Sequence, residues 1–397
     1  MRRSLLLSTA FAMSATISAM VPTDAARADD CLLDRDDDGI VDAGSVDNDG
    51  SANSGNDDTS IACGVQASAT GDFSSAFGSL ASAAGDRSVS IGRLSDAVLS
   101  DATAVGHNAQ ATGLESVAIG QSSVVTGTGA IAIGRNARSS GASALSVGWN
   151  SDALGDGALA IGGDDADADT LGAQATAASA TAVGADAVAS GADSSAFGNS
   201  ASALGGSSTA VGQGAMALST SSTAVGDSAS AADFATAIGA LANASASRSV
   251  AIGAGAGASA LGAVTLGDGA SASAEGAVAL GSGSVATEAN TVSIGASGSE
   301  RRLVNVADGV ADSDAATVGQ LNTAIGNIET NGSTYLATNS TGPGASAGGE
   351  DALAFGANTQ ATGTSAIAVG LDSASTATNA AAFGVSAEAN GDNSTAV

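Results

Sequence analysis

The sequence predicts an all-β fold, a parallel β-roll (solenoid) built from repeated rungs. A large apolar residue followed by Gly returns every fourteen positions, and Ala130–Gly134 (Ala-Ile-Ala-Ile-Gly) is one copy. Within each copy, large apolar residues alternate with Ala, Ser or Thr, and this period of two is typical of a strand with two distinct faces. Many copies carry another Gly seven residues earlier. Each rung is therefore expected to hold two short strands and two turns.

The repeat runs from Phe77-Gly78 to Ile294-Gly295 and returns from Phe355-Gly356 onward. We expect strands of about four or five residues, ended by Gly because Gly adopts positive φ and admits a close neighbouring backbone. At roughly 4.8 Å per rung, the first run predicts a rod of roughly 75 Å. The acidic residues 163–170 interrupt the period and predict a loop that leaves one corner, and one residue is missing before Ile238.

The interior of such a roll is expected to be thin. A tube filled with Ala and Ser buries little apolar area, so it barely offsets the conformational entropy that folding costs. The second row of large apolar residues then needs a cover, which predicts self-association along the rod. Whether the small or the large residues point inward stays open at this point.

The N-terminal residues and the composition predict an exported acidic protein. Residues 1–28 have the pattern of a signal peptide, with Arg2 and Arg3, an apolar stretch, and the cleavage motif Ala26-Arg27-Ala28. With 2% aromatic residues and 55 glycines, an ordinary large globular core is excluded. The net charge of −29 argues against nucleic acid or anionic lipid as a partner.

Residues 29–66 form an acidic segment between the signal peptide and the first repeats. Its two cysteines, Cys31 and Cys63, are expected to pair in an oxidising compartment. Carboxylates recur in the spacing typical of calcium loops, which predicts a Ca²⁺ site; the ligands would be Asp34, Asp36, Asp38 and Asp42. No Glu follows at the twelfth position of the loop, so a flexible acidic spacer is the alternative.

The period breaks after Gly295, and a different motif occupies residues 300–330. The residues that form this motif are Arg301, Leu303, Asn305, Val306, Ala307, Gly309, Asp314, Ala315, Gln320 and Leu321. The motif resembles the neck of trimeric autotransporter adhesins of the YadA type, with Thr317 where that pattern has Asn. The fourteen-residue repeat is similar to the head repeat of the same family. A short heptad-like stretch, Leu321, Ile325 and Ile328, ends at Asn331-Gly332.

The resemblance implies a domain order and an assembly. Residues 67–299 would form a first head, 300–330 a neck with a short coiled coil, 331–349 a linker, and 350–397 a second head cut off within a repeat. Three chains would wind as left-handed parallel β-rolls around one axis, with the neck residues as trimer contacts; these are Arg301, Leu303, Asn305, Val306, Asp314, Gln320 and Leu321. Such proteins are anchored in the outer membrane of Gram-negative bacteria by a C-terminal β-barrel. No barrel strands occur here, so we expect a fragment or an interrupted reading frame.

The resemblance also predicts the function, a cell-surface adhesin that contributes to virulence by attachment to extracellular matrix, host cells or other bacteria. A ligand-free structural spacer or filament is the alternative, and an ice- or crystal-binding solenoid, suggested by Thr209, Thr223 and Thr236, is a weaker one. No convergent set of titratable groups predicts an enzyme or a required cofactor. His107 and Trp149 are expected at rung corners, and Arg87, Arg93, Arg135 and Arg138 are expected to line one edge.

Overall fold

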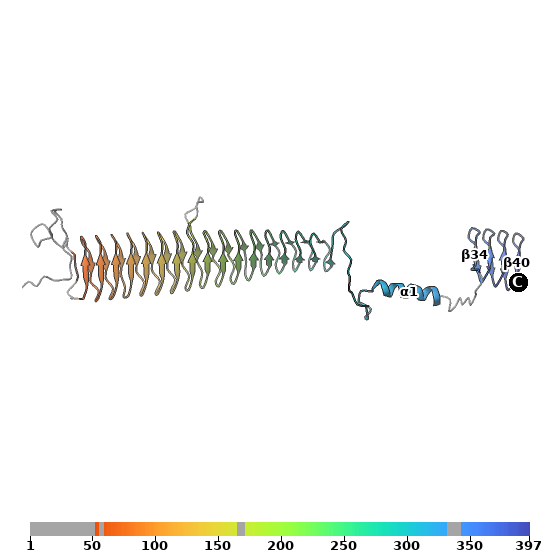
Figure 1. Cartoon of the computed structure of the whole chain (residues 1–397), viewed down its shortest axis with the longest axis horizontal. Coiled ribbons are helices and arrows are strands. Elements are labelled where there is room, and N and C mark those ends of the chain that lie inside the picture. Colours follow the sequence, from red (N-terminus) through yellow and green to blue (C-terminus); the bar gives the residue numbers. More distant parts are fainter. Residues whose placement is uncertain (1–51, 55–58, 165–170, 332–342) are drawn as a thin grey trace, which may run out of the picture. The chain divides into compact units, whose positions relative to one another are not determined.

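The computed structural model describes residues 52–54, 59–164, 171–331 and 343–397. It divides the chain into two compact units, residues 1–301 and 302–397. The described part of the first unit is a single stack of rungs, drawn from orange to green in Figure 1, and each rung contributes one strand to each of two parallel sheets. The predicted all-β parallel solenoid is confirmed.

Sheet 1 of the first unit has 17 strands, almost all of three residues. They are β1 (Ile61–Cys63), β3 (Ser75–Phe77), β5 (Val89–Ile91), β7 (Thr103–Val105), β9 (Val117–Ile119), β11 (Ile131–Ile133), β13 (Leu145–Val147), β15 (Leu159–Ile161), β17 (Thr181–Val183), β19 (Ser195–Phe197), β21 (Thr209–Val211), β23 (Thr223–Val225), β25 (Thr236–Ile238), β27 (Val250–Ile252), β29 (Val264–Leu266), β31 (Val278–Leu280) and β33 (Val292–Ser293).

Sheet 2 has 16 strands of two residues each. They are β2 (Ser68–Ala69), β4 (Ser82–Ala83), β6 (Asp96–Ala97), β8 (Gln110–Ala111), β10 (Val124–Val125), β12 (Arg138–Ser139), β14 (Asp152–Ala153), β16 (Gln174–Ala175), β18 (Val188–Ala189), β20 (Ser202–Ala203), β22 (Met216–Ala217), β24 (Ser230–Ala231), β26 (Asn243–Ala244), β28 (Gly257–Ala258), β30 (Ser271–Ala272) and β32 (Val285–Ala286).

The register of the strands follows the sequence repeat. Ile131 pairs with Leu145, fourteen positions later, in the usual rung-to-rung step. Ile161 pairs with Val183, so the acidic insertion is bypassed without loss of register. Val225 pairs with Ile238, thirteen positions later, so the missing residue is absorbed in a turn. The strand pairing stays in register at both irregularities. The insertion and the missing residue therefore change only the turns, and the sheets are intact.

The strands are shorter than the predicted four or five residues because the turns take up the remaining positions. After β11, the chain turns through Gly134 to Ala137, whose N–H donates to the Gly134 carbonyl at 3.4 Å. Gly134 has φ +143° and Asn136 has φ +56°, so two residues of this one turn adopt positive φ. A Cβ on Gly134 would lie 2.2 Å from the carbonyl oxygen of Gly148 on the next rung. Gly is thus required here both by the backbone angle and by the closeness of the stacked turns.

The interior of the roll is filled by small side chains. The middle residue of β11, Ala132, is fully buried, as is Ala137 at the end of the following turn. The largest fully buried side chain in the described part of the chain is that of Val125. This settles which residues point inward: the Ala and Ser positions form the core, and the large apolar residues on either side of them point outward.

The roll begins earlier than the predicted boundary at residue 67. β1 pairs with β3 in the regular register, and Asn53 bridges Ser68 one half-rung before. The simple pattern missed β1 because Cys63 takes the place of the large apolar residue before Gly64. In the second roll, too, the first strand precedes the predicted start at residue 350.

The second unit contains one helix and a short roll. Residues 302–317 lead into α1 (Val318–Asn331), which ends where the sequence predicts. The roll has two parallel sheets of four strands. The strands are β34 (Ser346–Ala347), β35 (Leu353–Phe355), β36 (Gln360–Ala361), β37 (Ile367–Val369), β38 (Ala374–Ser375), β39 (Ala381–Phe383), β40 (Glu388–Ala389) and β41 (Thr395–Ala396). None of the helices in the described ranges is both long and apolar enough to cross a membrane.

Candidate interaction surfaces

Sheet 1 presents a continuous apolar strip, which we define as the first and third residues of its strands. In β11, Ile131 is half-buried and Ile133 is 40% exposed, on either side of the buried Ala132. The third position is apolar in every three-residue strand. These residues are Cys63, Phe77, Ile91, Val105, Ile119, Ile133, Val147, Ile161, Val183, Phe197, Val211, Val225, Ile238, Ile252, Leu266 and Leu280. A strip of this length marks an interaction surface rather than ordinary scattered exposure.

The outward row of sheet 2 is mainly polar. It consists of the first residue of each two-residue strand, because the second residue points inward. The row contains Ser68, Ser82, Asp96, Gln110, Val124, Arg138, Asp152, Gln174, Val188, Ser202, Met216, Ser230, Asn243, Gly257, Ser271 and Val285. Both sheets point small side chains into the core, so they differ mainly in the residues of their outward rows.

The apolar strip has a polar interval in its first-position row. Thr181, Ser195, Thr209, Thr223 and Thr236 follow one another there, while the third-position row stays apolar through the same rungs. The Thr row suggested by the sequence therefore lies on the apolar strip itself. Each of these hydroxyl-bearing residues is half-buried beside a larger apolar neighbour such as Phe197 or Val211.

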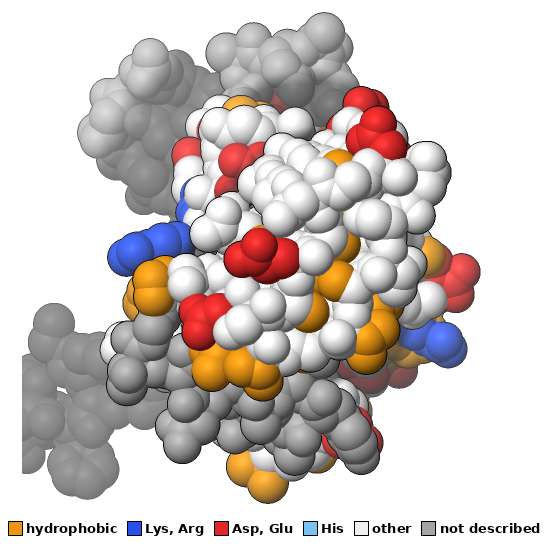
Figure 2. Space-filling view, turned by 90° about the vertical axis from the view of Figure 1, so that its right-hand side faces the viewer, with side chains coloured by type: hydrophobic (Ala, Val, Ile, Leu, Met, Phe, Trp, Pro, Cys, Tyr) orange, Lys and Arg blue, Asp and Glu red, His pale blue; other side chains and the backbone are white. Residues whose placement is uncertain are grey.

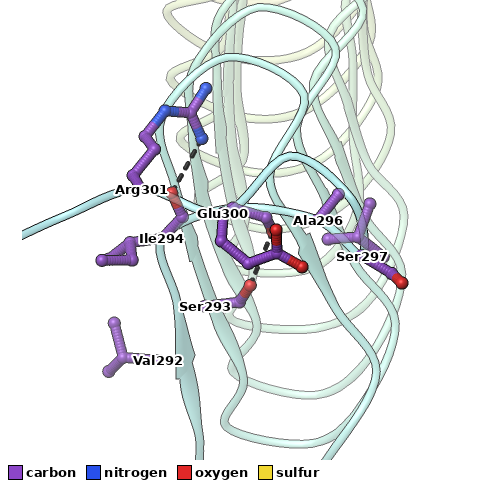
Figure 3. A pocket seen from close by; sticks show the side chains of 9 residues that line it. Val292, Ser293, Ile294, Ala296, Ser297, Glu300 and Arg301 are labelled. Carbon is purple, nitrogen blue, oxygen red and sulfur yellow. Dashed lines mark hydrogen bonds between the residues drawn. The ribbon is translucent and has the colours of Figure 1, made fainter.

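At the last rungs of the first roll, an open hollow of about 390 Å³ is lined by Val285, residues 292–297, Glu300 and Arg301. The guanidinium group of Arg301 spans its upper side in Figure 3, where it donates to the carbonyl of Ile294 at 2.7 Å. It also donates to Ser284 Oγ at 2.9 Å and to the Ser282 carbonyl. Arg301 thereby supplies hydrogen-bond donors to groups near the end of the stack, where no regular rung follows.

The start of α1 is fixed by a reciprocal capping arrangement. Thr317 Oγ1 accepts from the Gln320 N–H at 3.1 Å, and Gln320 Oε1 accepts from the Thr317 N–H at 3.1 Å. The Gln320 side chain also binds both backbone groups of Gly309, at 2.9 and 2.8 Å. Thr317, which replaces the Asn of the family pattern, further donates to Asp308 at 2.6 Å. The substitution therefore leaves this cap fully hydrogen-bonded.

Two carboxylates in this region accept backbone hydrogen bonds. Asp314 Oδ2 accepts from Ala311 and Val310, and these bonds hold the pKa of Asp314 below its usual value. The Gly298 N–H donates to Glu300 and likewise lowers the pKa of that carboxyl. Both groups order turns that flank the end of the first roll and the start of α1.

The remaining predicted neck residues expose their side chains in the single chain. Leu303 is 65% exposed, Leu321 is 55% exposed and Val306 is also exposed. Asn305 adopts φ +60°, which Asn tolerates better than most residues. Arg301 makes its contacts in the first unit, and Asp314 and Gln320 make theirs in the second. Their role as trimer contacts stays a prediction.

The predicted calcium ligands Asp34, Asp36, Asp38 and Asp42 lie outside the described residues, as does Cys31. Cys63, at the end of β1, is disulfide-bonded. Within residues 52–54, 59–164, 171–331 and 343–397, no three His, Cys, Asp or Glu side chains gather as a metal site would require. The calcium site and the pairing of Cys31 with Cys63 stay predictions.

The four arginines expected on one edge lie in three places, which corrects that expectation. Arg87 lies in a turn that follows sheet 2, Arg93 and Arg135 lie in turns that follow sheet 1, and Arg138 lies within β12 of sheet 2. The error arose because residues three positions apart within a rung lie on different sides of the roll. Only spacings of fourteen place side chains in one row.

Two of these arginines form ion pairs with carboxylates one rung away. Arg87 Nη2 lies 2.5 Å from Asp101 Oδ2, and the hydrogen bond from Arg87 holds the pKa of Asp101 below its usual value. Arg138 lies 3.7 Å from Asp152, whose pKa is raised because burial outweighs the attraction of the guanidinium group. Side chains of opposite charge in one row thus meet directly across the rung spacing.

The other two arginines meet His107 and Trp149. Arg93 Nη1 lies 3.1 Å from His107 Nε2, and the Arg135 guanidinium carbon lies 5.5 Å from the centre of the Trp149 ring. His107 and Trp149 are exposed in turns, as predicted. Their contacts were not predicted from the sequence, although the spacing of fourteen between the partners was a visible signal. In the view of Figure 2, acidic side chains are more frequent than basic ones, and both stand among a large area of backbone and uncharged polar side chains.

Comparison with known families identifies the repeats. The family model described as YadA head domain repeat (2 copies) matches residues 58–81, 69–95, 100–123, 111–137, 126–151, 139–164, 175–201, 189–215, 203–229, 230–256, 258–284, 272–297, 347–373 and 375–397, well over half of the chain. The chain belongs to the YadA-type trimeric autotransporter adhesins. A second model, the coiled stalk of trimeric autotransporter adhesin, matches residues 302–344, which contain the predicted neck and α1. The family is one of surface-exposed adhesins rather than enzymes.

Individual relatives of this adhesin chain match over shorter stretches. Autotransporter adhesin EhaG of Escherichia coli O157:H7 is 47% identical over 62 residues, which are 16% of this chain and only 4% of EhaG. Among solved structures, the collagen-binding domain of the Yersinia adhesin YadA is 27% identical, with a TM-score of 0.28. That match covers 51% of this chain and 86% of the YadA domain.

Proposed function

We propose that this chain is the head region of a homotrimeric surface adhesin, in which the apolar strips of three copies face one another around a common axis. The polar outward rows of sheet 2 then form the outer surface of the trimer. Attachment to extracellular matrix, host cells or other bacteria takes place through that outer surface and the turns. The protein is held at the outer membrane of a Gram-negative bacterium.

The observation that carries the trimer is the difference between the two outward rows of one roll. Small side chains fill the interior of the roll, so its large apolar side chains lie outside, and the strip gathers many of them in one continuous surface. At about 25 cal/mol per Å² of apolar area removed from water, covering the strip supplies stability that the Ala-filled interior lacks. A second copy of the same chain is the partner that matches the strip rung for rung, because both have the same repeat length.

Attachment is supported by family membership and by the repetition of the outer surface. Three identical outer faces allow several weak contacts to form at once, and linked contacts raise the overall affinity well beyond that of one contact. A ligand-free spacer would share the trimer and the roll. It differs only in making no specific contact with a matrix protein or a cell.

Two measurements on the mature chain test the proposal. Light scattering gives the mass of the assembly, and a mass of three chains is expected. Retention of the trimer on immobilised collagen, fibronectin and cultured host cells is expected to exceed that of an unrelated acidic protein. A stable, folded monomer would contradict the proposed trimer. Retention equal to that of the control protein on every surface would contradict the adhesin function and support the ligand-free spacer.

A further inference from the structure

One edge of the first roll differs from the rest of this acidic protein. The residue that follows each strand-ending Gly of sheet 1 points out of the turn, and five consecutive members of this row are Arg93, His107, Gln121, Arg135 and Trp149. We call these five residues the cationic edge. All five are exposed in the single chain. Adjacent members are one rung apart, so the edge extends over roughly 19 Å.

The composition of this edge is confined to those rungs. In the later described rungs of the first roll, the same row holds only small, amide or acidic residues. These are Gly163, Ala185, Asn199, Gln213, Asp227, Ala240, Ala254, Asp268 and Ser282. A general excess of basic residues does not explain the edge, because the whole chain has 11 basic and 40 acidic residues.

The cations of the edge are not neutralised by carboxylates of the described residues. Arg87 and Arg138, which lie elsewhere on the roll, each have an Asp partner one rung away. The two arginines of the edge have aromatic partners instead. Arg93 Nη1 lies 3.1 Å from the imidazole Nε2 of His107, and the guanidinium carbon of Arg135 lies 5.5 Å from the centre of the Trp149 indole. Arg135 lies over the indole ring, a contact that uses none of its N–H groups, and Arg93 uses only Nη1 toward His107. The remaining N–H groups of both form a planar fork that fits carboxylate and sulfate-like oxygens.

The stacked turns also fix the geometry of the edge. Next to it, the Asn136 amide donates to Asn150 at 2.9 Å, and the Asn150 amide donates to Asp164 at 3.1 Å. These side-chain bonds follow the same rung-to-rung spacing and brace the turns that carry Arg135 and Trp149. The edge is therefore a row of preformed contacts, and little side-chain ordering is needed when a ligand binds.

We propose that the cationic edge binds an anionic polysaccharide, laid along the row so that its acidic groups meet the arginines and a sugar ring stacks on Trp149. This inference rests on the proposed attachment function and names the class of its ligand. A thin extended chain suits an edge that is one residue wide. A membrane or a nucleic acid duplex would bring a broad anionic surface against an acidic protein, at a cost in electrostatic repulsion.

The test compares two double variants of the mature chain that lose the same charge. Arg93→Gln with Arg135→Gln removes the cations of the edge, and Arg87→Gln with Arg248→Gln removes two exposed arginines from the opposite turns. Binding to heparin, hyaluronan and neutral dextran is measured by biolayer interferometry at physiological salt. Far-ultraviolet circular dichroism and light scattering establish that each variant keeps the fold and the assembly of the parent.

The expected result is that the edge variant binds heparin at least about tenfold more weakly, whereas the opposite-turn variant changes by less than about twofold. Trp149→Ala is expected to weaken heparin binding as well, and dextran is expected not to bind. Equal losses in the two double variants would show general charge attraction and overturn the proposal. It is overturned equally if the parent does not bind heparin.

Two further probes separate this inference from other partners and from the proposed function. Polyglutamate or vesicles with anionic lipid, if bound as tightly as heparin through the same two arginines, would replace the polysaccharide by another class of ligand and overturn the assignment. If the parent attaches to cells but the edge variant keeps its heparin affinity, the inference fails while the adhesin function stands. If the parent fails to attach to cells and matrix but binds heparin through the edge, the adhesin function fails while the polysaccharide site stands.

Discussion

The two sheets of the first roll share one interior and have opposite exteriors. Inside, both contribute Ala and Ser, as Ala132 of sheet 1 and Ala111 of sheet 2 illustrate. Outside, sheet 1 carries the apolar strip, whereas sheet 2 carries residues such as Gln110 and Asp96. The two kinds of position in the repeat therefore have different roles. The small residues fill the interior of the single roll, and the large apolar residues form an outer surface that a partner can cover.

A stack with such a small-residue core also depends strongly on its backbone. Rungs approach so closely that a Cβ on Gly141 would lie 1.9 Å from the carbonyl oxygen of Gly155. The hydrogen bonds between rungs therefore contribute directly to holding the stack together, and its turns need residues that adopt positive φ. Matched substitutions in the outward rows of the two sheets can measure how much each row contributes to assembly and stability. The largest loss is expected for substitutions in the apolar strip.

Carboxylates placed in the apolar strip should abolish the trimer. Ile119→Asp with Ile133→Asp would bring six like charges together in the assembly, and buried unpaired charges are strongly destabilising. Light scattering is expected to show single chains. The matched variant in sheet 2, Ser230→Asp with Asn243→Asp on adjacent rungs, is expected to keep three chains. A trimeric strip variant would show that the strip is not the interface.

A methyl group on a strand-ending Gly of sheet 1 should destabilise the roll. Gly134→Ala forces Ala to φ +143° and against the Gly148 carbonyl, and such backbone strain alone costs about 1–3 kcal/mol. Gly257→Ala in sheet 2 is the control, because a Cβ there meets no atom within 4 Å. Thermal unfolding followed by circular dichroism should show a lower midpoint for Gly134→Ala alone. Similar midpoints would mean that the turns relax freely.

Replacement of the polar interval in the strip should stabilise the assembly. Thr209→Val with Thr223→Val extends the apolar row, and burial of each added methyl group contributes about 0.8 kcal/mol. The midpoint of thermal unfolding of the trimer is expected to rise. Ser202→Val with Ser230→Val on sheet 2 should leave it nearly unchanged, because those side chains face solvent. If the midpoint of the sheet 2 variant rises by as much, the apolar strip is no more buried in the assembly than the outward row of sheet 2.

The smallest effects should come from two carboxylates with opposite pKa shifts. Burial raises the pKa of Asp152 above 3.8, so its charged form costs stability at neutral pH and that cost is absent well below 3.8. The hydrogen bond from Arg87 lowers the pKa of Asp101, so its contribution is present above 3.8 and is lost as the pH falls through the lowered pKa.

Asp152→Asn should therefore raise the unfolding midpoint at pH 7, and Asp101→Asn should lower it. The difference for Asp152 should disappear once the pH is well below 3.8, and the difference for Asp101 should shrink at still lower pH, as the pH falls through its lowered pKa. Exposed ion pairs contribute little, so the shift for Asp101 is expected to be slight. Shifts of the same sign in the two variants would contradict the opposite pKa directions.

Much of the local structure could be predicted from particular residues. The spacing of Ile119, Ile133 and Val147 gave the rung length, and Gly at each strand end gave the turns, since stacked backbones leave no room for a Cβ. The neck motif contains Gln320, but its role in capping α1 within one chain was not predicted from the sequence. The start of the roll was missed because Cys63 stands in an apolar position, and the arginine rows were misassigned because sequence distance within a rung does not report the side of the roll.

The sequence alone determined the solenoid, its period, its interruptions and its family, because each depends on local backbone requirements that repeat and can be counted. Only the tertiary structure decided that Ala and Ser point inward and that Ile and Val point outward. An alternation of period two fixes that the two sets lie on opposite faces, but it does not say which face closes on itself. The tube is too narrow for anything larger than an occasional Val, and that steric limit sends the large apolar side chains to the surface.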